Sequence, residues 1–287
     1  MHFAGSFTFM NRNLLGRITI YFLLSALALV YMAPVIFMFV SSLKPDYRVL
    51  TDGSSILAFF PMEGTLQNYR DVYSRVNFNR FMFNSIFITT FIVSSGIVVN
   101  SMAGYALARL KWRGRETILI LVLSLLIIPF EAIAVPLFYQ MIIIGWRDSY
   151  QVQIFPFISD AFSIYLFYSF FIGMPKELEE AARLDGAGPF RIFFQIIIPN
   201  AKPVFASVAI LTFLMRWGSY LWPLLVTTGE TYRPLPVAMA AFENQVKLWG
   251  DIMAFGVMMV FPILLVFLLC QKWFVQGIAA TGTGYKK

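Results

Sequence analysis

The stretch EEAARLDGAGPFRIFFQIIIPNAKP, from Glu179 to Pro203, is a compact polar insert between two long apolar runs. Acidic residues, alanines and glycine come first, an aromatic-rich helical pattern follows, and prolines close the stretch. Because 59% of the 287 residues are hydrophobic and only 13% are charged, a polar insert of this length stands out. Because it lies between two apolar runs, any predicted fold must place those runs and this polar insert in different environments.

The composition predicts an all-α polytopic membrane protein. A water-soluble domain carries about 25% charged residues, and this chain has too few polar residues to cover its own surface. The net charge of +7 does not indicate nucleic acid, because the basic residues are distributed by loop rather than along one face. We therefore expect membrane lipid, and no nucleic acid, around the chain.

The residue types that many catalytic and metal sites need are almost absent. The single cysteine, Cys270, excludes an internal disulfide and a cysteine-rich metal site, and the single histidine is His2. The sequence contains neither the G-x-x-x-x-G-K-[ST] pattern of a P-loop nor G-x-S-x-G. We expect no catalytic residue, no metal site and no cofactor on this chain.

Six apolar runs are long enough to cross a membrane, whose core of about 30 Å needs roughly 20 apolar residues in helical form. The first run follows Arg12 and Arg17, as a signal peptide would. It is too long for the apolar part of a signal peptide and lacks a small-x-small cleavage site, so we predict an uncleaved span. The six runs lie near Ile18–Val40, Phe83–Leu107, Ile118–Trp146, Val152–Ile172, Val204–Val226 and Ile252–Cys270.

The third run is too long for one simple span and is interrupted by Pro129, Glu131 and Pro136. Proline removes a backbone donor and kinks a helix. We predict a span to about Pro129, then a bent or interfacial piece that carries Trp146 at the membrane surface. The kink either serves packing alone or breaks a helix that lines a transport pathway.

The distribution of Lys and Arg predicts that both termini are cytoplasmic. The strongest marker is ARLKWRGRE, residues 108–116, because basic residues concentrate in short cytoplasmic loops. With this orientation the two short outer loops contain only Arg147, Arg233 and Lys247, while the longer outer segment 43–80 has less influence. The inner segments contain Arg12, Arg17, Arg109, Lys111, Arg113, Arg115, Lys176, Arg183, Arg191, Lys202, Lys272, Lys286 and Lys287. The polar insert is then cytoplasmic.

The polar insert is predicted to form a short helix, a tight turn and a second helix between the fourth and fifth spans. Pro175 and the acidic residues after it favour the N-terminus of a helix, and Gly186 is suited to end that helix. Pro189 starts a second helix with an apolar face, which Pro199 and Pro203 end.

Two interpretations of this helix–turn–helix remain open from the residues alone. Small residues at Ala181, Ala182, Gly186 and Ala187 would let a partner protein approach the backbone, and Leu178 and Leu184 could pack in a socket of that partner. The alternative is an amphipathic turn that lies on the membrane surface.

The run that contains Glu180, Ala181, Ala182, Asp185, Gly186 and Ala187, followed by Ile198-Pro199, resembles the EAA loop of ABC importer permeases. The family often has Leu-Pro where this chain has Ile-Pro. The resemblance is to the carbohydrate-uptake branch, namely the second membrane subunit of maltose-type and glycerol-3-phosphate-type importers. It extends over NSI at 84–86, GYALARLKWRG at 104–114, WGSYLWPLL at 217–225 and QKWFVQGIAATG at 271–282.

The resemblance implies a non-catalytic permease subunit of an ATP-driven importer in a prokaryotic plasma (inner) membrane. Its implied partners are a second permease subunit in a heterodimer, two ATPase subunits or an ATPase homodimer that bind ATP and Mg, and an extracytoplasmic substrate-binding protein. Its implied activity is movement of a sugar or related polyol by alternating access. We favour a neutral saccharide over a phosphate ester, because Arg216 is the only clear basic residue along the path.

In this family the first short helix of the loop docks in a cleft of the ATPase subunit and moves the permease helices. The resemblance thus divides the chain into residues 1–80, an N-terminal span and outer loop, and residues 81–287, a five-span permease core that contains the EAA loop 174–203. The implied ATPase-coupling residues are Glu180, Ala181, Ala182, Leu184, Asp185, Gly186 and Ala187.

Asp160 and Arg216 lie in or near spans, where a charge at the bilayer centre costs about 3 kcal/mol. They either line the sugar path or pair at the subunit interface, or Asp160 simply lies near the outer membrane surface. Trp217 and Tyr220 have aromatic faces suited to sugar rings, and an interfacial aromatic belt is the alternative, which we favour for Trp222. The candidate path residues are Asp160, Arg216, Trp217 and Tyr220.

Two further segments have open roles. The outer segment 44–80 either meets a soluble binding protein or packs as a lid on the outer membrane face. The tail from Gly277 onward, with Thr281, Gly282, Thr283 and Gly284, suggests a flexible end that in this family can reach the ATPase.

Two other functions compete with the importer hypothesis. A stand-alone secondary transporter or channel would need an ionisable relay in the membrane, and an intramembrane enzyme would need a catalytic motif. A substitution of Gly186 separates them: the importer hypothesis predicts lost ATPase association with the fold intact, whereas the others predict a folding effect or none.

Overall fold

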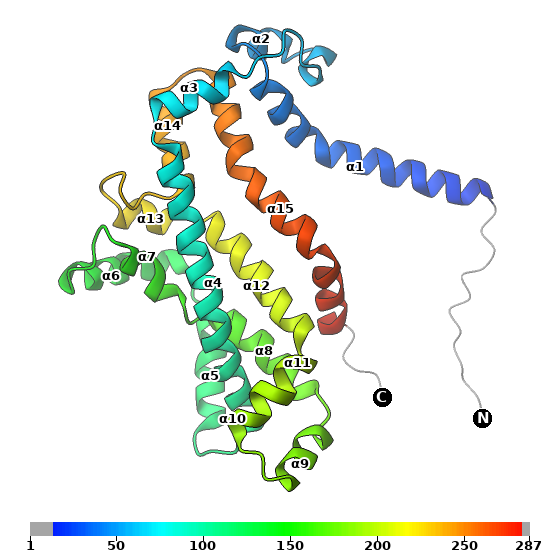
Figure 1. The fold of residues 1–287 in the computed structure, drawn as a ribbon, viewed down its shortest axis with the longest axis vertical. Helices are drawn as coiled ribbons and strands as arrows, with labels where there is room; N and C mark the ends of the chain where they lie inside the picture. The colour runs from blue at the N-terminus through cyan, green and yellow to red at the C-terminus, as the bar shows by residue number, and fades with distance from the viewer. Residues whose placement is uncertain (1–13, 283–287) are drawn as a thin grey trace. The chain divides into compact units, whose positions relative to one another are not determined.

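The computed structural model describes residues 14–282, and the regular structure among them is entirely helical (Figure 1). Over these residues the chain divides into two compact units. The first extends to Val72 and includes Lys247–Val257, and the second comprises Tyr73–Val246 together with the residues from Met258 onward. The prediction of an all-α protein is confirmed.

The first unit begins with α1, a long apolar helix with mostly exposed side chains, among them Tyr21, Phe22 and Tyr31. Exposed apolar side chains in such numbers are suited to lipid rather than to water. The elements of this unit are α1 (Leu14–Ser42), α2 (Asp46–Asp52), η1 (Ile56–Phe59) and the first parts of α3 (Gln67–Arg75) and α15 (Trp249–Gly282).

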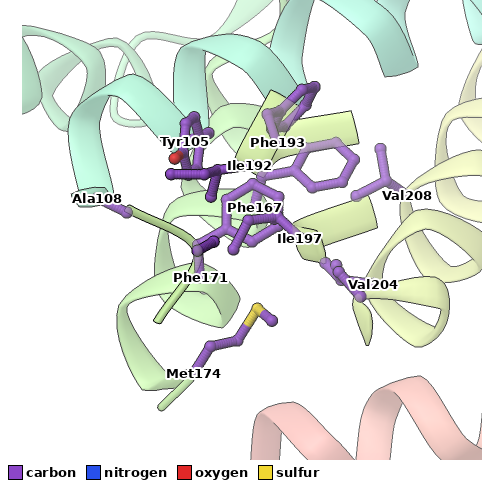
Figure 2. Packing of buried hydrophobic residues seen from close by; sticks show 12 residues of the cluster. Tyr105, Ala108, Phe167, Phe171, Met174, Ile192, Phe193, Ile197, Val204 and Val208 are labelled. Carbon is purple, nitrogen blue, oxygen red and sulfur yellow. The ribbon is translucent and has the colours of Figure 1, made fainter. Parts of the chain in front are cut away.

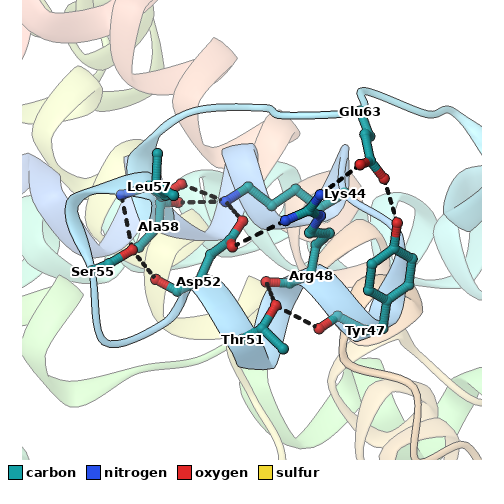
Figure 3. A network of polar contacts seen from close by, with 9 residues as sticks. All are labelled: Lys44, Tyr47, Arg48, Thr51, Asp52, Ser55, Leu57, Ala58 and Glu63. Carbon is teal, nitrogen blue, oxygen red and sulfur yellow. Dashed lines mark hydrogen bonds and ion pairs between the residues drawn. The ribbon is translucent and has the colours of Figure 1, made fainter.

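A polar network folds the segment that follows α1 (Figure 3). The buried ammonium group of Lys44 donates to the carboxylate of Asp52 at 3.1 Å and to a backbone carbonyl of η1 at 2.6 Å. The carboxylate of Glu63 accepts hydrogen bonds from Arg48, at 2.6 Å, and from Tyr47. These two bonds, that of Arg48 above all, lower the pKa of the Glu63 carboxyl. The predicted outer segment is therefore a folded element rather than a loose loop.

The second unit is organised around α4 (Phe78–Arg109), which packs along α8 (Ala161–Gly173) and α12 (Lys202–Trp217). Its other elements are α5 (Arg115–Leu125), α6 (Phe130–Ile143), α7 (Tyr150–Ile154), η2 (Phe155–Phe157), α9 (Glu177–Leu184), α10 (Pro189–Ile192), η3 (Phe193–Ile197, a π-helical turn), α11 (Ile198–Asn200), α13 (Leu221–Val226), α14 (Leu235–Gln245) and the later part of α15.

Among the described residues, four helical segments are long and apolar enough to cross a membrane, and two bent helix pairs raise the number to six if each pair is one span. The four segments are Gly16–Ser42, Phe78–Arg109, Tyr150–Gly173 and Trp249–Cys270. A polytopic arrangement is thus confirmed, while six spans with both termini inside stay a prediction.

The bend predicted in the third apolar run is confirmed. Helices α5 and α6 meet at 103° across a short break, and Pro129 is the residue immediately before α6. Proline cannot continue the hydrogen-bond ladder of the preceding helix, so the chain changes direction there.

The continuous span predicted at Val204–Val226 is wrong in its second half. α12 ends at Trp217, and the chain leaves the helix before α13 begins at Leu221. The break, residues 218–220, is short and lies between apolar segments, so the mean hydropathy of the run does not reveal it, although Gly218 is a poor helix former. At its other end α12 meets the helix formed by Pro189–Asn200 at 80°.

The last helix is longer than predicted. α15 continues to Gly282, beyond the predicted end at Cys270. The predicted flexible tail therefore begins as helix, and its remaining part, residues 283–287, lies outside the described residues.

α4 and α8 lie very close together at Gly104. A β-carbon built on Gly104 would lie 2.6 Å from the Cβ of Phe167 and 3.0 Å from the next backbone nitrogen of α8. One turn earlier, the side-chain amide of Asn100 donates to the carbonyl of Ile158 at 3.0 Å and accepts from the N–H of Asp160 at 3.0 Å. Small and hydrogen-bonding residues on one face are the usual means of close helix packing in membranes.

We expect Gly104→Ala to destabilise the protein by about 1–3 kcal/mol, because the added methyl group overpacks the α4–α8 contact. Heating the detergent-solubilised protein and measuring the remaining monodisperse fraction by fluorescence-detected size exclusion checks this. Gly173→Ala is the control, since a β-carbon there meets nothing within 4 Å. Equal melting temperatures for the two variants would contradict the close contact.

Candidate functional site: the helix–turn–helix insert

The first helix of the polar insert, α9, ends in a Schellman motif. The N–H of Gly186 donates to the carbonyl of Arg183 at 3.0 Å, and the N–H of Ala187 donates to the carbonyl of Ala182 at 2.9 Å. This pair of bonds requires a left-handed residue, and Gly186 has a φ of 78°. The prediction that Gly186 ends the helix is confirmed.

One side of α9 is built into a hydrophobic cluster of the second unit (Figure 2). Ala182 is its apolar contribution from α9 and is buried. The other members come from α4, α8 and the chain between α10 and α12, and they are Tyr105, Ala108, Phe167, Phe171, Met174, Ile192, Phe193, Ile197, Ala201, Val204 and Val208. α9 is therefore attached to the membrane helices rather than resting loosely beneath them.

A buried ion pair adds a polar connection between α9 and α4. The Nε of Arg109, the last residue of α4, lies 3.3 Å from Oε1 of Glu179 in the first turn of α9. The two side chains are 4% and 5% exposed. Arg109 also donates to the carbonyl of Met174, which follows α8, and Arg183 lies 3.5 Å from the other carboxylate oxygen of Glu179.

The opposite side of α9 faces outward. Leu184 is 89% exposed, the largest such fraction among the exposed large hydrophobic residues. Four other residues that we expected to contact an ATPase are exposed, and Ala187 is half-buried. Ala182 is the exception, because its side chain belongs to the hydrophobic cluster. The exposed expected residues other than Leu184 are Glu180, Ala181, Asp185 and Gly186.

The second helix of the insert continues from Pro189 to Asn200 through the π-helical turn η3. Its inward side, with Ile192, Phe193 and Ile197, enters the cluster, while Phe190 remains exposed. The predicted helix–turn–helix is thus confirmed.

The structure places the two charged path candidates near the middle of the second unit. The guanidinium carbon of Arg216 lies 4.2 Å from the centre of the Phe157 ring, a cation–π contact. Arg216 lines a narrow cavity of about 20 Å³, room for a water molecule. Asp160 caps α8, because its carboxylate accepts from the N–H of Ser163 at 2.8 Å and from the hydroxyl of Ser163 at 2.7 Å.

The aromatic candidates differ in exposure. Trp217 is 1% exposed, and its indole N–H donates to the carbonyl of Met259 at 3.1 Å, so the structure gives it a packing role. Tyr220 is 43% exposed, just before α13. The aromatic-belt interpretation of Trp222 is wrong: its side chain is buried, and its N–H donates to the carbonyl of Val152 at 2.8 Å.

Two sets of contacts are not evident from the sequence. The Arg109–Glu179 pair joins positions far apart in the chain. The sequence features that could have indicated it are an arginine at the end of a span and an acidic residue directly before the EAA run. Asn84, in the NSI segment, is fully buried and donates to the carbonyls of Thr231 and Arg233 at 3.0 and 2.9 Å. The hydroxyl of Tyr150 donates to the oxygen of Asn84 at 2.7 Å, so Asn84 holds the loop between α13 and α14.

Comparison with known families gives a match that covers most of the chain. Residues 97–280 match the family described as "Binding-protein-dependent transport system inner membrane component". This range includes the ion pair, the insert and all four path candidates.

Comparison with curated proteins gives relatives over almost the full chain. The arabinooligosaccharides transport system permease protein AraQ of Halalkalibacterium halodurans is 33% identical, over 89% of this chain and 92% of the relative. The trehalose/maltose transport system permease protein MalG of Thermococcus litoralis is 32% identical, over 94% and 98%. The sn-glycerol-3-phosphate transport system permease protein UgpE of Brucella abortus is 28% identical, over 94% and 96%.

Comparison with solved structures gives a similar fold. A chain in the crystal structure of a bacterial ABC transporter that imports the acidic polysaccharide alginate has a TM-score of 0.80 and 26% identity. The match covers 92% of this chain and 99% of that one.

We expect Gly186→Val to loosen the C-terminal turn of α9, because a left-handed conformation costs a β-branched residue about 1–2 kcal/mol. Hydrogen–deuterium exchange of the amides of residues 184–188 should be faster than in the wild type. Gly188→Ala is the control, since Gly188 has a φ of −75° and open space around it. Unchanged exchange in Gly186→Val would contradict the role of the Schellman motif.

Proposed function

We propose a specific role for this chain within the family to which it belongs, the inner membrane components of binding-protein-dependent transport systems. Members are permease subunits of ABC importers, and the chain is accordingly a non-catalytic membrane subunit, with ATP hydrolysis on separate ATPase subunits. Its relatives and the alginate importer chain are parts of such systems, so a stand-alone transporter or channel is not supported.

In our proposal α9 is the helix that docks on an ATPase subunit. The observation that carries this role is its two-sided construction: Ala182 and Glu179 are buried against the membrane helices, while Leu184 is 89% exposed on the other side. A leucine held so far out of the core is suited to a socket on a partner. The proposed docking residues are Glu180, Ala181, Leu184, Asp185 and Gly186, with Ala182 and Ala187 supporting them from behind.

The orientation follows from the docking role. We propose six spans with both termini in the cytoplasm of a prokaryotic cell. Four are the long helical segments, the fifth is the bent pair of α5 and α6, and the sixth is the bent pair of Pro189–Asn200 and α12. α9 then lies on the same side as the basic segment 108–116, which agrees with the preference of Lys and Arg for cytoplasmic loops.

The proposed assembly contains a second permease subunit, two ATPase subunits that bind ATP and Mg, and a substrate-binding protein outside the membrane. The family description itself supports the binding protein.

We propose that the cargo is a sugar or related polyol, with a neutral saccharide favoured. The relatives AraQ and MalG transport arabinooligosaccharides and trehalose or maltose. Arg216 is the basic residue among our candidates for the transport path. Because its guanidinium already contacts the Phe157 ring, it is less available to bind a phosphate group. Asp160, Arg216 and Tyr220 remain our candidates for the lining of that path.

Replacement of the exposed leucine tests the docking role. We expect Leu184→Asp to reduce recovery of the ATPase subunit with the tagged permease by about tenfold or more, since a socket contact of this kind contributes at least 1–2 kcal/mol. Affinity purification from the native host in mild detergent, with quantitative mass spectrometry, measures the recovery.

Phe190→Asp is the matched control, because it introduces the same charge at an exposed apolar residue outside α9. Both variants should keep the wild-type melting temperature. Wild-type recovery of the ATPase with Leu184→Asp would rule out α9 as the docking helix.

The cargo is tested with the purified importer in proteoliposomes. We expect ATP hydrolysis to rise when the binding protein is loaded with an arabino-oligosaccharide, trehalose or maltose, and not with glycerol 3-phosphate, because Arg216, the basic residue among our path candidates, already contacts the Phe157 ring. Stimulation by glycerol 3-phosphate alone would overturn the preference for a neutral saccharide.

A further inference from the structure

α9 is connected to the membrane helices covalently at both of its ends and by one ion pair. The chain enters α9 from α8 through residues 174–176, and it leaves through the second helix of the insert, Pro189–Asn200, which turns by 80° into α12. The non-covalent connection leads from Glu179 to Arg109 at the end of α4. We propose that the Arg109–Glu179 ion pair transmits the movement of the docked α9 to α4, so that both are positioning residues for ATP coupling. This inference rests on the proposed docking role of α9.

The pair joins three helices at one point. Arg109 is the last residue of α4, its guanidinium contacts Glu179 in the first turn of α9, and it donates to the carbonyl of Met174 directly after α8. The planar guanidinium makes both contacts at once, since its Nε lies at ion-pair distance from the carboxylate of Glu179 while its Nη2 donates a hydrogen bond to the carbonyl of Met174. The ends of α4, α8 and α9 therefore move together as long as Arg109 keeps both partners.

The surroundings make this connection stiff. Both side chains are about 95% shielded from solvent, at 4% and 5% exposure, so water and salt screen their attraction little. Each charge also suits its own helix, since a cation is favoured at the C-terminal end of α4 and an anion in the first turn of α9. Removing Glu179 would leave Arg109 as an uncompensated buried charge, and removing Arg109 would leave the buried Glu179 with only the exposed Arg183 as a partner. Arg183 adds little, because its side chain is 53% exposed.

The apolar contacts beside the ion pair do not fix the orientation of α9 relative to α4 as the ion pair does. Ala182 meets the cluster with a single methyl group, and apolar contacts of this kind tolerate small rotations and slides. An ion pair between two fixed helix ends resists both. Because α4 continues from Arg109 to Phe78 and holds the loop between α13 and α14 through Asn84, a push at its inner end reaches the other end of the unit.

The test measures whether α9 and α4 stay together during the ATP cycle. In a Cys270→Ser background, which removes the single native cysteine, spin labels are placed at the exposed positions Glu177→Cys on α9 and Val98→Cys on α4. Pulsed electron paramagnetic resonance on the whole complex gives the distance distribution without nucleotide and with ATP and vanadate. No transport substrate is needed.

We expect the wild-type pair to give the same single narrow distance peak in both states. Glu179→Gln and Arg109→Gln should keep that peak without nucleotide and lose it with ATP and vanadate, because the driven helix then moves without α4. The exchange Arg109→Glu with Glu179→Arg should restore the single peak. Arg109→Lys, which keeps the charge but loses the fixed donor directions, should restore it only in part.

Two results would overturn the inference. One is a wild-type distance distribution in both nucleotide states for Glu179→Gln and Arg109→Gln, which would mean that the covalent connections and the apolar cluster suffice. The other is an equally altered distribution with and without nucleotide that the charge exchange does not correct, which would mean that the pair serves folding alone.

Recovery of the ATPase subunit separates this inference from the docking proposal. The ion-pair variants leave the exposed face of α9 intact, so we expect them to retain the ATPase as the wild type does. If the wild type itself recovers no ATPase, or if Leu184→Asp has no effect on recovery, the docking proposal fails. If docking holds and the distances do not respond, only the ion-pair inference fails.

Discussion

The close approach of α4 to α8 at Gly104 is the contact on which the second unit depends. With no side chain at Gly104, the two backbones come near enough for Asn100 to bond the chain just before α8. The same approach brings Tyr105 and Ala108 of α4 against Phe167 and Phe171 of α8 and starts the hydrophobic cluster. The position of the polar insert follows, because its inward side chains fill the rest of that cluster.

The polar insert combines an apolar attachment with an electrostatic one, and the two have different physical properties. The cluster stabilises the insert through buried area, which is insensitive to direction. The pair between Arg109 and Glu179 adds little net folding free energy, since burying two charges is costly, but it fixes the position of α9 relative to the end of α4. A helix that must receive a force and pass it on needs the second property as well as the first.

Local features of the chain were predictable from sequence because they depend on neighbouring residues. Pro129 predicts the bend before α6, and Gly186 and Pro189 predict the turn between the two helices of the insert, since backbone geometry follows from these residue types. The helical class follows from composition. Length and composition leave the number of spans between four and six, because they cannot tell a bent pair from one span.

Long-range features were not predictable in the same way. The end of α12 at Trp217 is hidden by apolar residues on both sides, and the inward direction of Ala182 depends on how α9 is rotated against the cluster. Tryptophan is a residue type that stacks on sugar rings or lies in the aromatic belt of a membrane protein. Trp217 and Trp222 are instead buried, and the indole N–H of each donates a hydrogen bond to a backbone carbonyl. Side-chain direction is a property of tertiary packing, which a single sequence shows only indirectly.

The burial of Arg109 and Glu179 also constrains how the gene can change over time. Substitution of Glu179 alone leaves Arg109 as an unpaired charge in the interior, and substitution of Arg109 alone leaves Glu179 with only the exposed Arg183, so each position restricts what is tolerated at the other. The two positions lie on different helices and far apart in the chain, and they are expected to vary jointly or not at all. Exposed Leu184 is under a different constraint, since its tolerated replacements depend on the surface of another gene's product.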